Sequence, residues 1–198
     1  MRPLYIALAL LGLACGGQAS PDGPLDDSTS GALGAASPVA PDNFVKVRDG
    51  LYRGAHPNAK NLDYLRSIGV HRILDLEVDD LVEAQPGDIL LEETESLWKG
   101  IKLVREPMSA FEPAIRDEFD HRMDRVVALL KTATPTDPIY VHCKHGQDRT
   151  GLVIGLERVY VEGWTPAAAF NEMRERGFHT FFLGLDEYFE RKTGYSPD

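Results

Sequence analysis

The feature that most constrains this chain is the segment VHCKHGQDRTG, which runs from Val141 to Gly151. It lies between a short apolar run (139–141), which predicts a buried strand, and residues 152–161, whose pattern predicts a helix. A loop between two such elements can turn successive backbone N–H groups inward, and the positive end of the helix dipole faces the same point. Arg149 adds a planar guanidinium that holds two phosphate oxygens at once. The segment therefore predicts an anion site with Cys143 at its rim as a reactive thiolate.

The same segment resembles the His-Cys-x5-Arg-Ser/Thr signature of the cysteine-dependent phosphatases, and this resemblance implies a role for each position. Cys143 would attack phosphorus, Arg149 would bind the phosphoryl oxygens, and Thr150 would hydrogen-bond the thiolate. His142 would orient the loop from beneath. The phosphate would lie on the loop formed by Lys144, His145, Gly146, Gln147, Asp148 and Arg149.

We expect neither a metal nor another cofactor. A zinc site made from His142, Cys143 and His145 would place three candidate ligands on one short loop, and the chain has no other cysteine after Cys15. Such an arrangement is improbable for zinc.

Lys144 and His145 follow the nucleophile directly, where their charge suits a substrate with more than one phosphate. The alternative is that both are ordinary solvated loop residues.

Outside the signature the resemblance is narrower. Residues 49–57 (DGLYRGAHP) and the apolar pattern of 61–76 resemble the start of compact atypical dual-specificity phosphatases of plant and fungal type and their bacterial relatives. The similarity runs from about Asn43 to Tyr160. It implies hydrolysis of phosphomonoesters through a cysteinyl-phosphate, on inositol polyphosphates or phosphoinositides. A protein tyrosine or dual-specificity phosphatase is the alternative, and a phosphate-binding pseudo-enzyme is a second one.

The general acid has more than one candidate, and some acid is required because an alkoxide leaves poorly unless it is protonated. Asp148 directly precedes Arg149, and Asp-Arg-Thr endings resemble the loops of bacterial and lipid-directed phosphatases, in which this aspartate is a candidate acid. Glu112 is the only carboxylate of the segment 107–113, where a mobile acid loop is expected. Asp117 and Glu106 remain further alternatives.

The amino-terminal part predicts an export signal over residues 1–19. Its apolar run of ten residues is too short for a bilayer, which needs roughly 20 residues, but it suits a signal peptide. Residues 11–17 resemble a bacterial lipoprotein box, which would put a lipid on Cys15 and limit the signal to residues 1–14; the alternative is cleavage before Ser20. We expect a periplasmic or outer-membrane lipoprotein with a possible membrane tether at Cys15, or otherwise a secreted protein.

Residues 20–42 are rich in Ser, Pro, Gly, Ala and Asp and predict a disordered linker, so the phosphatase domain is expected at 43–195.

The chain has 21 Lys+Arg and 31 Asp+Glu, a net charge of −10. This charge argues against a nucleic-acid partner and leaves a phosphorylated small molecule, lipid or protein as the expected partner. Strand patterns alternate with helical ones, which predicts an α/β fold with a central, largely parallel sheet flanked by helices. The strands are expected at 44–47, 51–53, 70–76, 101–104 and 139–141, and the helices at 61–67, 90–98, 114–131, 151–161, 165–176 and 186–192.

Two further features favour structural interpretations. Arg53 and His56 lie near the hairpin predicted around Gly50, where a turn-stabilising role is favoured over contact with phosphate. The stretch from Asp75 to Glu95 holds nine carboxylates and neither lysine nor arginine. It contains no twelve-residue calcium-binding loop, so a solvated acidic face is expected.

Overall fold

The computed structural model describes residues 37–78, 88–109 and 116–197, which form five strands and six helices. In chain order these are β1 (Val45–Arg48), β2 (Leu51–Ala55), α1 (Ala59–Ser67), β3 (Arg72–Asp75), α2 (Asp88–Trp98), β4 (Lys102–Arg105), α3 (Arg116–Lys131), β5 (Ile139–Cys143), α4 (Asp148–Tyr160), α5 (Pro166–Glu175) and α6 (Leu183–Thr193). Within these residues, no helix has both the length and the apolar character needed to cross a membrane.

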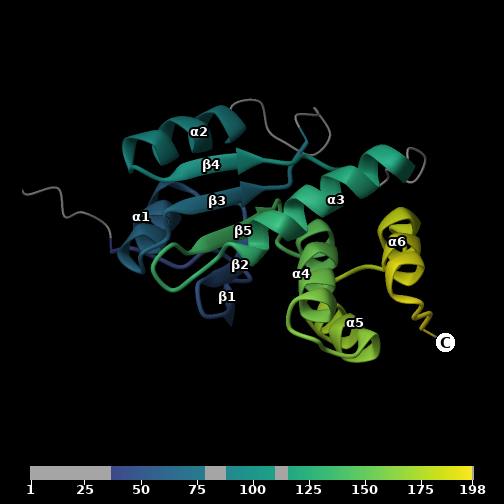
Figure 1. Ribbon diagram of the computed structural model, residues 1–198. Coiled ribbons are helices and arrows are strands. Elements are labelled where there is room, and N and C mark those ends of the chain that lie inside the picture. Colours follow the sequence, from purple (N-terminus) through teal and green to yellow (C-terminus); the bar gives the residue numbers. More distant parts are fainter. Residues whose placement is uncertain (1–36, 79–87, 110–115, 198) are drawn as a thin grey trace, which may run out of the picture. The chain divides into compact units, whose positions relative to one another are not determined.

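The strands form one sheet in the order β1-β2-β5-β3-β4 (Figure 1). β1 and β2 make the predicted antiparallel hairpin, whereas β2, β5, β3 and β4 pair in parallel. The predicted α/β fold with a largely parallel sheet is therefore confirmed. β5 has a parallel neighbour on each side, so the residues that follow it lie at the middle of the sheet's carboxyl edge, where such sheets bind ligands.

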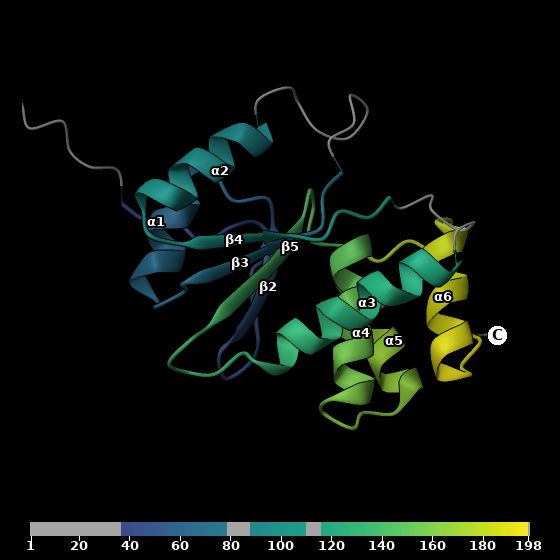
Figure 2. The same cartoon turned by 45° about the horizontal axis from the view of Figure 1, so that its top comes forward.

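Side chains that alternate along each strand supply two separate cores. Leu74 and Val141 belong to the larger core, which also takes in buried side chains of α3, α4, α5 and α6. Ile73 and Tyr140, their neighbours in sequence, belong to the smaller core with α1. Figures 1 and 2 show α1 and α2 on one side of the sheet and α3 to α6 on the other. Both faces of the central strand are thus covered, as its uninterrupted burial requires.

Helix starts follow the local sequence. The Asn58 side chain accepts hydrogen bonds from the backbone N–H groups of Lys60 (2.9 Å) and Asn61 (3.1 Å), so α1 begins two residues before the predicted Asn61. Thr165 caps α5 through a bond from the Ala168 N–H (3.2 Å), as predicted. These caps satisfy backbone donors that a helix leaves unpaired in its first turn.

The packed domain begins a few residues before the expected boundary at Asn43. The Asp42 carbonyl accepts a hydrogen bond from the Ala55 N–H at 2.8 Å. The Val39 carbonyl accepts one from the Asn61 side chain at 2.9 Å. The last residues of the predicted linker therefore lie against β2 and α1, and these two hydrogen bonds fix the position of the chain just before Asn43.

Candidate active site

The signature segment forms the junction between β5 and α4, as predicted. Cys143 is the last residue of β5 and is 1% exposed. Arg149 and Thr150 lie in the first turn of α4, and both are buried. The loop 144–147 joins the two elements in four residues. The thiol, the guanidinium and the hydroxyl are thus gathered at the positive end of a helix dipole, where an anion is stabilised.

Three successive carbonyls of the loop are bonded to the surrounding structure. The Lys144 carbonyl accepts from the His56 N–H (3.2 Å), and the carbonyls of His145 and Gly146 accept from the Asn43 side chain (3.5 and 2.9 Å). In a trans peptide the C=O and the next N–H point in opposite directions. The N–H groups of the three following residues therefore face the interior of the loop, which is the arrangement of an anion-binding nest.

Arg53 supplies a further support to the loop. Its Nη2 donates to the Gly146 carbonyl at 2.8 Å, and its side chain is fully buried. The turn-stabilising role favoured by the sequence is wrong, because β2 pairs in parallel with β5 and directs Arg53 beneath the catalytic loop. Burial lowers the pKa of Arg53 to about 10, while the charges of Glu172 and Cys143 act in the opposite direction.

The loop also needs a glycine at position 146. Gly146 has φ of +66°, and a Cβ there would lie 2.3 Å from the backbone of Gly54. Both the left-handed conformation and the contact between β2 and the loop exclude a side chain. Gly146 was expected only as one of the phosphate-binding residues, and the structure shows in addition that the shape of the loop requires a glycine at this position.

Thr150 has a hydroxyl that fits the role implied by the signature. Its Oγ1 is buried and makes no hydrogen bond within the described part of the chain. A buried hydroxyl without a partner costs free energy, on the order of 1–3 kcal/mol. A thiolate or a bound anion in the loop would provide the missing partner.

His142 lies beneath the loop in a buried cluster of ionisable side chains. Its Nε2 is 3.0 Å from Glu92 Oε1, and its Nδ1 is 3.5 Å from Glu77 Oε1. His56 approaches the same carboxylate, with Nδ1 2.8 Å from Glu77 Oε1. Burial opposes the charged form of His142, but the carboxylates of Glu92 and Glu77 raise its pKa well above the usual value. Opposed by burial, the imidazoles of His142 and His56 lower the pKa of Glu77.

The solvated acidic face expected between Asp75 and Glu95 is therefore wrong for three of its carboxylates. Asp75, Glu77 and Glu92 are 0%, 3% and 2% exposed. Their partners come from other parts of the chain: Arg105 Nε donates to Asp75 Oδ2 at 2.8 Å, and the imidazoles of His56 and His142 approach the other two. Charges are buried only when they are paired, and the pairing here is tertiary.

Asp148, the favoured candidate acid, is held by a residue that the sequence did not single out. Its Oδ1 accepts the His179 backbone N–H at 2.8 Å and lies 3.0 Å from His179 Nδ1. The Asp148 side chain is 13% exposed, and that of His179 is 44% exposed. His179 follows the α5 helix, 31 residues after Asp148, and no spacing pattern pointed to it. The contact orients the carboxylate at the loop while leaving one side of it near solvent.

The other candidate acids are placed differently. Glu112 lies outside the described residues. Both carboxylate oxygens of Glu106 accept hydrogen bonds from Arg125 (2.8 and 2.7 Å), so this carboxylate is occupied by an ion pair. Asp117 is exposed in the first turn of α3. Within the described residues, Asp148 is the carboxylate that directly follows the loop, at the first position of α4.

The remaining loop residues differ in exposure and packing. Lys144 is partly exposed and His145 is exposed, which is compatible with the predicted position at the rim. Gln147 packs against Gly177, where a Cβ would lie 2.7 Å from its amide nitrogen. Gly177 has φ of +90°, which favours glycine. The segment that carries His179 is thereby brought close to the loop.

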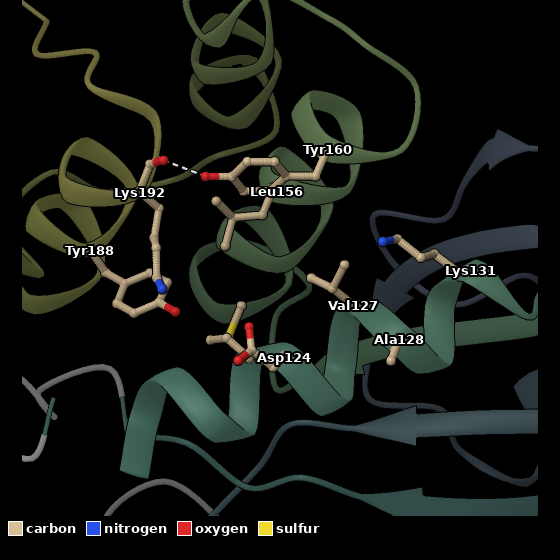
Figure 3. Close-up of a pocket in the computed structure, with 9 residues that line it drawn as sticks. Asp124, Val127, Ala128, Lys131, Leu156, Tyr160, Tyr188 and Lys192 are labelled. Carbon is tan, nitrogen blue, oxygen red and sulfur yellow. Dashed lines mark hydrogen bonds between the residues drawn. The ribbon is translucent and has the colours of Figure 1, made fainter. Parts of the chain in front are cut away.

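A cavity of about 410 Å³ lies elsewhere, between α3, α4 and α6 (Figure 3). Figure 3 shows the Tyr160 hydroxyl bonded to the backbone carbonyl of Lys192 at its edge. None of its lining residues belongs to the loop: they are Met123, Asp124, Val127, Ala128, Lys131, Leu156, Tyr160, Tyr188 and Lys192. This cavity is therefore separate from the phosphate site.

A thiol at the carboxyl end of the central strand, inward amides and an arginine in the first helical turn define the site of a cysteine-dependent phosphatase. Residues 38–181 match the Tyrosine phosphatase family (Y_phosphatase2), and the chain belongs to this family. The predicted resemblance to atypical dual-specificity phosphatases of plant, fungal and bacterial origin is confirmed by the individual relatives.

The chain is 32% identical over 136 residues to the dual specificity protein phosphatase TpbA of Pseudomonas aeruginosa. That match covers 69% of this chain and 55% of the relative. Inositol diphosphatase DSP1 of Oryza sativa subsp. japonica is 28% identical over 134 residues, covering 68% of this chain and 56% of the relative. The chain thus spans about half the length of these relatives.

Solved structures agree with the fold. The crystal structure of P. aeruginosa TpbA has a TM-score of 0.61 at 25% identity and covers 78% of this chain and 86% of that one. A Cys-to-Ser variant of TpbA in complex with pTyr has a TM-score of 0.60 at 25% identity and covers 79% and 90%. The catalytic core of the PP-IP phosphatase SIW14 from S. cerevisiae, at 23% identity, has a TM-score of 0.59 and covers 78% and 87%.

Proposed function

We propose that this chain hydrolyses phosphomonoesters through a cysteinyl-phosphate intermediate. The observation that carries the proposal is the loop itself. Cys143 ends the central strand, three loop amides face inward, and Arg149 and Thr150 stand in the first turn of the helix that follows. The arrangement binds a tetrahedral dianion next to a sulfur nucleophile.

In the first step the substrate phosphate binds to the loop amides and to Arg149. The Cys143 sulfur attacks phosphorus, an S–P bond forms, and the bond to the ester oxygen breaks. The departing oxygen takes a proton from a general acid. Asp148 is the acid we favour because it directly follows the loop and is oriented by His179. Glu112 is the alternative.

In the second step a water molecule attacks the phosphoenzyme. A P–O bond forms, the S–P bond breaks, and the proton of the water returns to the group that acted as the acid. The Thr150 hydroxyl, which makes no other hydrogen bond among the described residues, donates to the thiolate as it leaves. Inorganic phosphate then dissociates, and Cys143 is ready for another cycle.

The substrate class proposed is an inositol polyphosphate or a phosphoinositide. Lys144 directly follows the nucleophile and is partly exposed, so it would add positive charge for neighbouring phosphates in a protein whose net charge is −10, with the exposed His145 beside it. Inositol diphosphatases are among the relatives. The alternative is a phosphotyrosine or dual-specificity protein phosphatase, which the TpbA complex with pTyr favours.

Phosphate release by the full chain from inositol polyphosphates, phosphoinositides and phosphotyrosine peptides tests both the proposed activity and the proposed substrate class. Cys143→Ser should abolish turnover and keep phosphate affinity, because the amides and Arg149 remain. Residual turnover in that variant would overturn the covalent mechanism, and binding without turnover in the wild type would indicate a phosphate-binding pseudo-enzyme.

Lys144→Ala should lower kcat/KM for polyphosphates and leave that for a small aryl phosphate nearly unchanged. The advantage of polyphosphates should also shrink with added salt, since steering by local charge is screened. Higher kcat/KM for phosphotyrosine peptides at physiological ionic strength would replace the polyphosphate proposal by a protein phosphatase.

We further propose that the protein is exported and anchored to a membrane through a lipid on Cys15. The support is the short apolar run and the lipoprotein-like segment around Cys15. Metabolic labelling with a fatty-acid analogue should label the wild type and spare Cys15→Ala. Mass spectrometry that finds Ser20 as the first residue of an unlabelled protein would indicate signal cleavage and free secretion.

A further inference from the structure

The buried cluster beneath the catalytic loop contains more ionisable groups than the orientation of His142 requires. It lies at the carboxyl ends of β3 and β5 and just after β2, and one member comes from α2. The side chains are His56, Asp75, Glu77, Glu92 and His142, all buried except His56, whose side chain is 22% exposed.

The three carboxylates of this cluster need positive charges that neutralise them. Arg105 is bonded to Asp75 and compensates that carboxylate. Glu77 and Glu92 then remain, and among the described residues their ion-pair partners are the imidazoles of His56 and His142. Either two protons or one divalent cation neutralises the pair, and buried charges must be neutralised in one of these ways.

The distances between the nitrogen and oxygen atoms suit a metal. Zn²⁺ binds His and carboxylate ligands at roughly 2.0–2.1 Å in a tetrahedral arrangement, which separates neighbouring ligand atoms by about 3.3 Å. Glu77 Oε1 lies 2.8 Å from His56 Nδ1 and 3.5 Å from His142 Nδ1. One ligand atom from each of the three residues lies within 4.8 Å of the other two. Two imidazoles and one carboxylate around an open fourth position form a recurrent zinc ligand set.

A second observation points to a ligand at the same place. His142 is fully buried, and neither its Nδ1 nor its Nε2 makes a hydrogen bond within the described part of the chain, although Glu92 Oε1 lies 3.0 Å from Nε2. At 3.5 Å from Glu77 Oε1, Nδ1 is too far for a good hydrogen bond, although it faces that oxygen. A buried nitrogen that faces a carboxylate without bonding it is explained if both atoms share a third partner.

Glu92 completes the arrangement from the other side of the ring. Its Oε1 lies 3.0 Å from His142 Nε2, and its side chain is fully buried. A histidine that binds a metal through one nitrogen commonly presents the other to a carboxylate, which fixes the ring. A cavity of about 150 Å³ is lined by His56 and Glu92, together with Leu62, Leu91 and others, so it borders one proposed ligand and the carboxylate beside the His142 ring.

We propose that His56, Glu77 and His142 bind a divalent transition-metal ion such as Zn²⁺, with water in the fourth position and Glu92 holding the His142 ring. Mixed imidazole and carboxylate ligands favour Zn²⁺ over Mg²⁺ or Ca²⁺, which prefer oxygen ligands alone. The ion ties the segments that end β2, β3 and β5 together directly beneath Cys143. This site shares His142 with the His142, Cys143 and His145 set that was rejected as a zinc site, but it includes neither Cys143 nor His145.

The test uses the full chain carrying Cys143→Ser, because a catalytic thiolate would itself bind zinc. Titration of Zn²⁺ against a chromophoric chelator should show one tight equivalent, and Zn²⁺ should raise the melting temperature. Adding His56→Ala, a partly exposed position, should weaken the affinity at least 10-fold and remove the thermal shift. His121→Ala, an exposed histidine on α3, is the matched control and should change neither.

Glu77→Gln gives an independent check, because it keeps the shape of the side chain and removes its charge. It too should weaken the tight equivalent at least 10-fold. Absence of binding below about 10 µM Zn²⁺ in the Cys143→Ser parent would overturn the proposal. Equal affinity in the parent and in folded His56→Ala and Glu77→Gln proteins would overturn it as well.

Discussion

Arg53 and Gly146 are 93 residues apart in sequence, yet the guanidinium of the first donates a 2.8 Å hydrogen bond to the carbonyl of the second. The bond joins β2 to the catalytic loop through the interior of the protein. Asn43 donates to the same carbonyl from the surface side at 2.9 Å. Two donors on one carbonyl hold that peptide in a single orientation, with its N–H directed into the loop.

Arg53→Met should reduce activity more than stability. The variant loses a charge-assisted hydrogen bond, on the order of 1.5–3 kcal/mol. It also removes a buried charge whose Nε and Nη1 make no hydrogen bond within the part of the chain that the structure describes. Because these effects oppose each other, the melting temperature should change little. The loop carbonyl is freed on one side, so kcat/KM for an aryl phosphate should fall by about 10-fold or more. Arg66→Met, on the exposed side of α1, is the control and should behave as wild type.

Arg149→Lys should reduce turnover by on the order of 10²-fold or more. Lysine retains the positive charge and loses the planar fork that binds two phosphoryl oxygens. Steady-state rates with an aryl phosphate measure the effect, and circular dichroism confirms the fold. A near-normal rate would mean that Arg149 does not bind the transferred phosphoryl group.

The contact between Asp148 and His179 makes the general acid testable. Asp148→Asn should flatten the basic limb of the pH–rate profile and slow alkyl phosphates much more than aryl phosphates, which depart without protonation. His179→Ala leaves the carboxylate in place but removes the ring beside it, so it should show the same preference for aryl substrates at about a tenth of the wild-type alkyl rate. Glu112→Gln should be milder than Asp148→Asn; the reverse order would assign the proton to Glu112.

The parts of the molecule that the sequence revealed are local. Cys143, Arg149 and Thr150 lie within eight residues, so one strand-to-helix junction carries all three. The alternation of Ile73 and Leu74 between two cores could likewise be expected from strand periodicity. The fold and the reactive centre were therefore within reach of pattern and spacing.

The residues that hold the site in place could not be predicted from the sequence, because their contacts depend on which strands and helices become neighbours. Arg53 reaches the loop only because β2 pairs with β5, and His179 reaches Asp148 only because the turn after α5 packs against the start of α4. Glu77 and Glu92 resemble solvated acids in sequence, since their imidazole partners lie in other elements. Tertiary pairing decides each of these cases, and no spacing within a single element encodes it.

Glu157 predicts a pH dependence of stability that is independent of catalysis. Its side chain is buried in α4, Arg48 Nε donates to its Oε1 at 2.6 Å, and its Oε2 has no hydrogen-bond partner within the described residues. Burial raises the pKa of Glu157 to about 7, an effect that Arg48 opposes and Glu162 reinforces. The folded protein therefore holds a proton that the unfolded chain releases near pH 4.5. Stability from this group is present below that pH and is lost as the pH rises through 7.

Glu157→Gln should remove this loss, because glutamine has the shape of the protonated acid and cannot ionise. The variant should match the wild type near pH 4.5 and melt a few degrees higher than it at pH 8. Thermal unfolding monitored by circular dichroism across this range measures both curves, and Glu187→Gln, exposed on α6, controls for the loss of one carboxylate. If the melting temperatures of wild type and Glu157→Gln stay parallel from pH 4.5 to 8, Glu157 is ionised throughout and its pair with Arg48 outweighs its burial.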